Sequence, residues 1–286
     1  MEKLLTLFLS VLLLLQLVSC QSSSKISIDK CINETEKDNL ITKYLTNGAF
    51  LYSYNDPNWG IYCDSLIAIC PNIAEVYRIK AIPHIKNGDY AQAFLLENKT
   101  VELDAQTWMS YRAFLKCIFT KDYEGAIVDF DEAEKLNPKD YVMDHTHFFY
   151  RGLCNLELGN YQEAERDLKQ DVAIQTNGND SVSVHFNTLF YLGVLYYETE
   201  QYNNAIIYLE NSIKNYNQFP DAHYYLAKIL INQHKNELAA KYLQIAQNSL
   251  EKGYSINEDN VFYANYPHQI TLYEVTQEIN QLKLTK

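Results

Sequence analysis

Two histidines and an aspartate lie close together in the middle of the chain, and their side chains are of types that bind metal ions. His145 and His147 are separated by one residue, and Asp144 precedes them. A catalytic zinc ion takes three protein ligands of these kinds together with a water molecule. No third ligand follows at the spacing of a known metal motif. We therefore expect neither a metal site nor a metal cofactor.

Other residue patterns that could support catalysis are equally incomplete. The acidic run Asp129, Asp131, Glu132 and Glu134 lacks the glycine-containing loop of a calcium site, so we interpret it as a solvated helix face. Serine, histidine and aspartate all occur, but without the strand-to-helix motif that mounts a nucleophilic serine. The chain also lacks a glycine-rich phosphate loop. The sequence predicts no catalytic residues, no cofactor and no enzyme.

The cysteines do not suggest a disulfide scaffold. Apart from Cys20 their number is odd, so no complete disulfide framework is implied. Cys63 and Cys70 would lie roughly 10 Å apart along one helix, beyond the reach of a disulfide. Cys117 and Cys154 fall in apolar helical stretches, where a buried thiol is the common role. The fifth cysteine, Cys31, lies ahead of Cys63 in the chain.

The amino terminus carries an apolar run, residues 4–18, interrupted by only three polar residues. This run has the layout of a secretory signal and is too short to span a membrane as a helix. It closes with Leu17-Val18-Ser19-Cys20, which resembles a bacterial lipoprotein box. The resemblance implies a signal peptide at 1–19 and lipidation of Cys20. The alternative is an ordinary cleaved signal, with Cys20 a free or disulfide-bonded thiol.

Residues 20–35 are expected to form a polar tether, because consecutive serines cannot build a core. No aspartate follows Cys20 directly. In the lipoproteins that this region resembles, that pattern implies the outer membrane when the host has two membranes. We therefore expect a bacterial cell-envelope protein, lipid-anchored through Cys20 and facing the periplasm.

Charge and composition exclude some partners. The chain has a net charge of −12 and 47% apolar residues. It can build a core, but it lacks the clustered lysine and arginine that bind phosphates. We expect no nucleic-acid partner, and membrane attachment through the lipid alone.

A short motif is repeated along most of the chain. It occurs as GDYAQA at 88–93, KDYEGA at 121–126, GNYQEA at 159–164 and EQYNNA at 200–205, with a degenerate HKNELA at 234–239. Successive copies are 33, 38, 41 and 34 residues apart. A period near 34 is typical of stacked helix-turn-helix units.

The copies resemble tetratricopeptide repeats in the placement of small residues, which allow two helices to approach closely. In the first helices these are Ala81, Gly152, Gly193 and Ala227, and in the second helices Ala93, Ala126, Ala164, Ala205 and Ala239. Ala133 and Ala246 fill the next small site. The resemblance implies an all-α fold, a right-handed α-solenoid of antiparallel helix pairs, over residues 36–253. Residues 254–286 would add an aromatic segment and a capping helix.

The motif positions predict where each helix lies. The expected pairs are 74–87 with 90–103, 107–119 with 122–136, 142–157 with 161–175, 184–198 with 202–215, and 221–232 with 236–251. A divergent pair is expected at 36–54 and 58–70, and a last helix at about 268–284. In the second pair, Tyr111 of the first helix lies twelve residues before the turn residue Tyr123, whereas in the third pair Tyr150 lies eleven residues before Tyr161. The extra residue predicts a longer turn. Leu272, Val275, Ile279 and Leu282 would form the apolar stripe of the cap.

In tetratricopeptide repeats the first helices line a concave groove that binds extended peptides. Counting twelve residues back from each turn position places five residues in this groove by analogy: Arg78, Tyr111, Phe149, Phe190 and Tyr224. Aromatic rings in register favour an apolar or aromatic ligand. Alternatively, these rings only pack between helices, or the segment from Tyr254 to Tyr266 folds back into the groove. Arg78 and Lys228 are too far apart in the stack to clamp a terminal carboxylate together.

The function that this pattern favours is a non-catalytic, membrane-anchored scaffold or adaptor that binds a protein or peptide segment of the cell envelope. Two alternatives remain open. One is a glycan- or small-ligand-binding lipoprotein, which the 24 tyrosines would suit. The other is an acidic inhibitor or immunity protein, because opposite charge speeds encounter with a basic partner.

Overall fold

The computed structural model describes residues 31, 33–179, 183–256 and 266–284. The expected signal peptide, Cys20 and most of the expected tether lie outside these residues. The chain divides into two compact units, residues 1–83 and 84–286, which are described separately. Among the described residues, no helix has the length and apolar character needed to cross a membrane.

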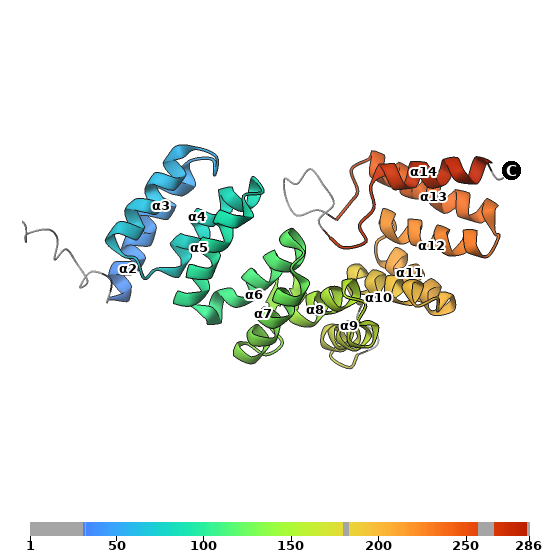
Figure 1. The fold of residues 1–286 in the computed structure, drawn as a ribbon, viewed down its shortest axis with the longest axis horizontal. Coiled ribbons are helices and arrows are strands. Elements are labelled where there is room, and N and C mark those ends of the chain that lie inside the picture. The colour runs from blue at the N-terminus through green and yellow to red at the C-terminus, as the bar shows by residue number, and fades with distance from the viewer. Residues whose placement is uncertain (1–30, 32, 180–182, 257–265, 285–286) are drawn as a thin grey trace, which may run out of the picture. The chain divides into compact units, whose positions relative to one another are not determined.

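The first unit is helical but less regular than expected. It contains α2 (Glu34–Ile41), the π-helical turn η2 (Thr42–Thr46), the 3-10 turn η3 (Ala49–Leu51), α3 (Pro57–Ile69) and most of α4 (Ala74–Lys86) (Figure 1). The prediction of one helix over 36–54 is wrong, because the chain turns at Gly48. A side chain there would collide with the Tyr44 carbonyl group and the Tyr62 ring, so only glycine fits.

A disulfide that the sequence pattern did not indicate ties this unit together. Cys31 is bonded to Cys70, with their Cα atoms 5.5 Å apart, while Cys63 is a buried free thiol. Cys31 lies ahead of α2 and of the predicted helix pairs, so helical spacing could not pair it with a partner. Trp59 lies in the same core and donates its indole N–H to the Ile79 carbonyl at 3.0 Å.

The second unit is a run of antiparallel helix pairs that begins after α5 (Tyr90–Leu103). The pairs are α6 (Ala105–Leu115) with α7 (Tyr123–Leu136), α8 (His147–Glu157) with α9 (Tyr161–Thr176), α10 (Phe186–Glu198) with α11 (Tyr202–Asn215), and α12 (Pro220–Asn232) with α13 (Asn236–Glu251). This all-α solenoid confirms the predicted fold class. The small residues do hold the pairs together: a Cβ on Gly152 or Gly193 would lie 2.8 or 2.7 Å from a leucine of the facing helix.

The repeated motif is the turn between the two helices of a pair. Its first residue has a left-handed backbone in every copy, with φ between 56° and 76°, at Gly88, Lys121, Gly159, Glu200 and His234. Its second residue then caps the next helix. In two copies this residue is an aspartate, and the Asp122 carboxylate accepts from the Gly125 N–H at 3.0 Å. The motif is therefore a turn signal that also fixes where each second helix starts.

The third pair begins later than predicted, because a small hairpin replaces the start of its first helix. Strand β1 (Tyr141–Val142) pairs antiparallel with β2 (His145–Thr146), and the turn residues Met143 and Asp144 have φ of 46° and 68°. A helix cannot continue through two left-handed residues. The Thr146 hydroxyl then caps α8 by accepting from the Phe149 N–H at 3.2 Å.

The extra residue of the second pair lies inside its first helix, so the prediction of a longer turn is wrong. The last turn of that helix is π-helical, η4 (Lys116–Thr120), and its end is closed by left-handed Lys121. A π-helical turn holds one more residue than an α-helical turn. The register of the motif is therefore kept without lengthening the turn.

The chain ends in a cap that packs on α13, as expected. Helix α14 (Leu272–Leu284) begins four residues later than predicted, because His268 has a left-handed backbone with φ of 56°. Val275 and Leu282 are buried, but Leu272 is 41% exposed and does not belong to the packed stripe. Of the aromatic segment, Phe262 and Tyr263 lie outside the described residues.

Candidate binding groove

A short segment ahead of α14 lies against the first helices of three consecutive pairs. We call residues 266–270 the strap, and the surface of α8, α10 and α12 that contacts it the groove. Figure 1 shows the red trace of the strap running from the C-terminal cap toward these helices. Tyr266 and Ile270 at its two ends are buried. The sequence left open that the segment from Tyr254 to Tyr266 occupies the groove, but residues 257–265 of that segment lie outside the described residues. The residues that the structure does place against these helices are 266–270.

Two contacts recognise the strap's main chain. The buried Tyr191 hydroxyl on α10 donates to the Pro267 carbonyl at 2.8 Å. The Asp221 carboxylate at the start of α12 accepts from the Ile270 N–H at 2.7 Å. Main-chain groups are common to all peptides, so these contacts do not depend on the side chains of residues 267 and 270.

Two more contacts recognise a side chain of the strap. His268 Nδ1 lies 2.9 Å from the Tyr225 hydroxyl on α12, and His268 Nε2 lies 2.9 Å from the Glu157 carboxylate on α8. Burial raises the pKa of Glu157, but the hydrogen bond and charge of His268, the hydrogen bond from Tyr123 and the charge of Lys121 together outweigh that effect, and the pKa is lowered overall. Glu157 is therefore suited to remain ionised opposite a cationic side chain.

Asp221 is incompletely satisfied. Its side chain is fully buried, and burial raises its pKa to about 7, although the hydrogen bond from the Ile270 amide opposes this rise. Among the described residues, its second oxygen, Oδ2, has no hydrogen-bond partner. A buried polar atom without a hydrogen-bond partner is costly. The groove thus offers a polar atom that the strap does not use.

The cap is held to the groove by an ion pair of its own. Lys228 on α12 lies 2.9 Å from Glu278 on α14. The lysine considered for a carboxylate clamp is thus already paired within the chain.

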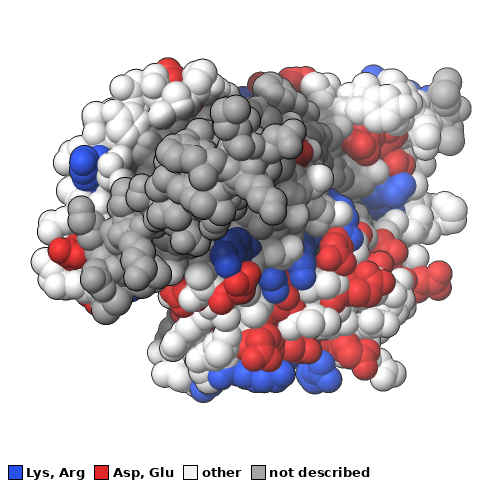
Figure 2. All heavy atoms as spheres, turned by 60° about the vertical axis from the view of Figure 1, so that its left-hand side comes forward, with Lys and Arg blue, Asp and Glu red and all other residues white. Residues whose placement is uncertain are grey.

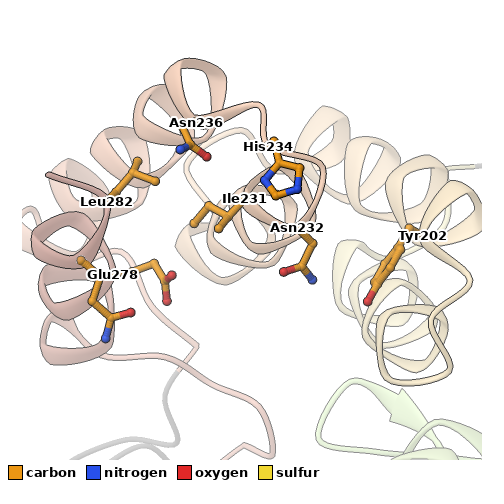
Figure 3. A pocket seen from close by; sticks show the side chains of 8 residues that line it. Tyr202, Ile231, Asn232, His234, Asn236, Glu278 and Leu282 are labelled. Carbon is orange, nitrogen blue, oxygen red and sulfur yellow. The ribbon is translucent and has the colours of Figure 1, made fainter. Parts of the chain in front are cut away.

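An open pocket of about 740 Å³ lies between α14 and the turns that begin α11 and α13. Figure 3 shows Tyr202, Asn232 and Glu278 around this hollow. The Tyr202 ring lies 6.1 Å from Tyr197, which lies 5.3 Å from Tyr225. A row of tyrosines therefore connects the pocket to the residue that holds His268.

The structure corrects two of the five residues predicted to line the groove. Phe149 and Phe190 are fully buried between helices and present no side-chain surface to a ligand. Tyr111 and Tyr224 are half-buried, on α6 and α12. Arg78 is half-buried and belongs to the first unit.

The tyrosines that contact the strap lie one residue beyond two of the predicted positions, Phe190 and Tyr224. They are Tyr191 and Tyr225. Each tyrosine also precedes the small residue of its helix by two, as in Tyr191-Leu192-Gly193. Aligning the first helices on that small residue would have identified both tyrosines. Glu157, Asp221 and the strap carried no comparable signal.

The histidines of the hairpin serve packing. His145 stacks on Phe149 with ring centroids 3.8 Å apart, and burial together with the neighbouring His185 lowers its pKa to about 3. His147 Nδ1 lies 3.0 Å from the Glu134 carboxylate. Within the ranges that the structure describes, no three histidine, cysteine or acidic side chains are grouped to hold a metal ion.

Charge on the surface is mixed. Figure 2 shows Asp and Glu side chains intermixed with Lys and Arg on one face of the molecule. Together with the net charge of −12, the Glu157 carboxylate that faces the strap gives the groove an acidic character. A basic partner would be attracted to it.

Comparisons with known proteins agree with this fold. Residues 190–251 match the family model described as Tetratricopeptide repeat. PilF of Pseudomonas aeruginosa has a similar structure, with a TM-score of 0.59 at 15% identity over 87% of this chain and 97% of that one. PilW, a type IV pilus biogenesis factor, gives 0.57 at 15% identity over 82% and 96%.

A third solved structure, MamA from Desulfovibrio magneticus RS-1, gives a TM-score of 0.51 at 17% identity over 64% of this chain and 97% of that one. At such identities the likeness establishes the fold alone. A search of curated protein sequences found no match.

Proposed function

We propose that this protein is a non-catalytic, lipid-anchored adaptor of the bacterial cell envelope that holds a segment of a partner protein in the groove. The observation that carries the proposal is the strap itself. The groove already binds a short turn-forming segment through Tyr191, Asp221, Tyr225 and Glu157. These are the contacts that recognition of a foreign segment would require.

The location is inferred from Cys20 and its apolar leader, and it agrees with the pilus role stated for PilW, whose fold is similar. Replacing Cys20 with alanine tests it. We expect the wild-type protein in the membrane fraction, released only by detergent, and the variant in the soluble fraction. Equal recovery of both in the soluble fraction would contradict the lipid anchor.

The groove is tested by cross-linked co-purification from the native host with the full chain. The variant Glu157→Gln/Asp221→Asn keeps the shape of both side chains but removes their charge. The matched control Asp131→Asn/Glu165→Gln changes two partly exposed carboxylates outside the groove. We expect a partner recovered with the wild type and the control and lost with the groove variant. Equal recovery with all three would exclude the groove as the binding site.

A second candidate is a small-ligand protein. The open pocket combines the Tyr202 ring with amide and carboxylate side chains, Asn232, Asn236 and Glu278. Aromatic faces beside planar polar groups suit a saccharide. Loss of a bound sugar in Tyr202→Ala, with no protein partner in either form, would favour this function.

A further inference from the structure

The strap is held at three points that lie close together around a turn of its backbone. His268 has a left-handed φ of 56°, and the Gln269 N–H donates to the Tyr266 carbonyl at 3.3 Å. The groove contacts the carbonyl of residue 267, the side chain of residue 268 and the N–H of residue 270. Two of the three are main-chain groups. The third, the His268 side chain, contacts both Tyr225 and Glu157, and the contact with Glu157 favours a positive charge.

The strap is a poor match for this site in two respects. It leaves Asp221 Oδ2 buried without a partner among the described residues. It also places a histidine opposite Glu157, and a histidine carries a charge only when protonated. Lysine or arginine keeps its charge at neutral pH and brings additional N–H donors. A segment with such a side chain would pair fully with Glu157.

The strap can leave without loss of the cap. Helix α14 packs on α13 and has its own ion pair to α12, Lys228 with Glu278. Neither contact involves residues 266–270. The groove is therefore occupied by a segment of the same chain, and that segment can detach while α14 stays packed.

We propose that the strap is an internal stand-in for a partner's segment, and that the groove binds a turn-forming segment with a lysine or arginine at the place of His268 and an aliphatic residue at the place of Ile270. The inference rests on the proposed adaptor function and names the chemistry of its partner. The occupant is a segment of another protein, because the chain itself is acidic and a second copy would offer the same imperfect strap.

The test uses a fluorescent, end-capped peptide of sequence Tyr-Pro-Arg-Gln-Ile and the full chain, with binding followed by fluorescence anisotropy. In His268→Ala/Ile270→Ala the strap is weakened, and we expect binding at least about tenfold tighter than to the wild type, because the internal competitor is removed. Adding Glu157→Gln to this variant should weaken binding by about tenfold, since one charged partner is lost. Tyr273→Ala, a 68% exposed residue of α14, should bind as the wild type does.

Three results would overturn the proposal. The first would be that the strap-weakened variant folds but binds the arginine peptide no better than the wild type does. The second would be that a peptide of the reversed sequence binds as well as the arginine peptide. The third would be that a peptide with histidine in place of arginine binds equally well. The strap of a second copy could then occupy the groove as readily as a partner's segment.

If the strap-weakened variant does not fold, hydrogen exchange of the wild-type protein tests the proposal instead. Saturating peptide should speed hydrogen exchange at the Ile270 amide, because its bond to Asp221 is lost, whereas unchanged exchange contradicts displacement. The proposed function is tested separately. A partner lost in Glu157→Gln/Asp221→Asn, together with no binding of the arginine peptide, would leave the adaptor function standing and reject this inference alone.

Discussion

At the scale of single residues, the first position of the turn motif shows how one backbone angle organises the repeat. Two of the five copies place glycine there, at Gly88 and Gly159, and the others hold Lys121, Glu200 and His234 in the same left-handed conformation. Such a conformation costs an L-residue with a side chain roughly 1–2 kcal/mol. The three non-glycine turns are therefore maintained by the packing of the helices around them.

Gly159→Ala is expected to lower the free energy of unfolding by about 1 kcal/mol. An added Cβ would meet nothing within 4 Å, so the cost is in the backbone alone. Gly60→Ala is the matched control, because Gly60 lies inside α3 with equal space around it and without a left-handed φ. We expect the opposite sign there, a gain of about 0.5–1 kcal/mol, in urea unfolding. The same sign for both would contradict this account.

Asp221 should make stability fall as pH rises. Its pKa is raised from 3.8 to about 7, so the folded protein holds a proton between these values that the unfolded chain has released. The folded state binds more protons, and raising the pH through this range lowers the free energy of unfolding by at most about 1.4 kcal/mol per pH unit. Asp221→Asn keeps an oxygen for the Ile270 N–H and removes the titration.

The check for Asp221 is urea unfolding of the wild type and Asp221→Asn from pH 4 to pH 8. We expect the wild type to lose stability relative to the variant across this range. Parallel profiles would show that the carboxylate is not held protonated by the fold.

At the scale of elements, an arginine on the first helix joins the two helices of a pair. Arg151 on α8 donates twice to Asp167 on α9 at 2.8 Å, and Arg112 does the same with Asp129 in the preceding pair. The π-helical turn η4 makes the second of these separations one residue longer without changing the contact. The ion pair is therefore part of the repeat.

Arg151→Ala should destabilise the second unit by about 3–5 kcal/mol, because it leaves the buried Asp167 carboxylate without its main partner. Lys169→Ala removes an exposed ion pair on the same helix pair and should cost less than about 1 kcal/mol. Urea unfolding of both variants measures the difference. Similar small losses would mean that water or Arg166 replaces Arg151 at little cost.

Local sequence signals predicted the elements well where one residue type has one structural role. The alanines, the turn tyrosines and Pro138 placed most helix boundaries within a few residues. The hairpin at 141–146 was missed because neither of its left-handed turn residues, Met143 and Asp144, is a glycine, the residue that would mark such a turn. The groove was expected on the first helices, but the residues that contact the strap were missed because they come together only through tertiary packing, from α8, α10, α12 and a segment far along the chain.

At the scale of the whole molecule, the two units differ in how they are stabilised. The second relies on stacked helix pairs, whereas the first has shorter helices and the disulfide between Cys31 and Cys70. A disulfide restricts the unfolded chain and is worth about 2–4 kcal/mol in typical cases. Such a bond persists in an oxidising compartment, which agrees with the proposed envelope location.

Cys31→Ser/Cys70→Ser should therefore lower the melting temperature of the first unit and leave the second unchanged. The chain has two tryptophans, Trp59 in the first unit and Trp108 in the second. In a Trp108→Phe background, fluorescence reports on the first unit alone, and Trp59→Phe gives the complementary signal. A shift of both transitions by the same amount would mean that the two units unfold as one.

The adaptor account is tested most directly by photo-cross-linking in the native host. A photoreactive phenylalanine replaces Tyr224, which lies on α12 beside the strap-binding Tyr225, or Tyr161, a 37% exposed residue of α9 outside the groove. The account predicts an adduct with a partner at position 224 and none at 161, and mass spectrometry should locate it in a segment containing lysine or arginine. Adducts at 161 without any at 224 would contradict the groove as the binding site.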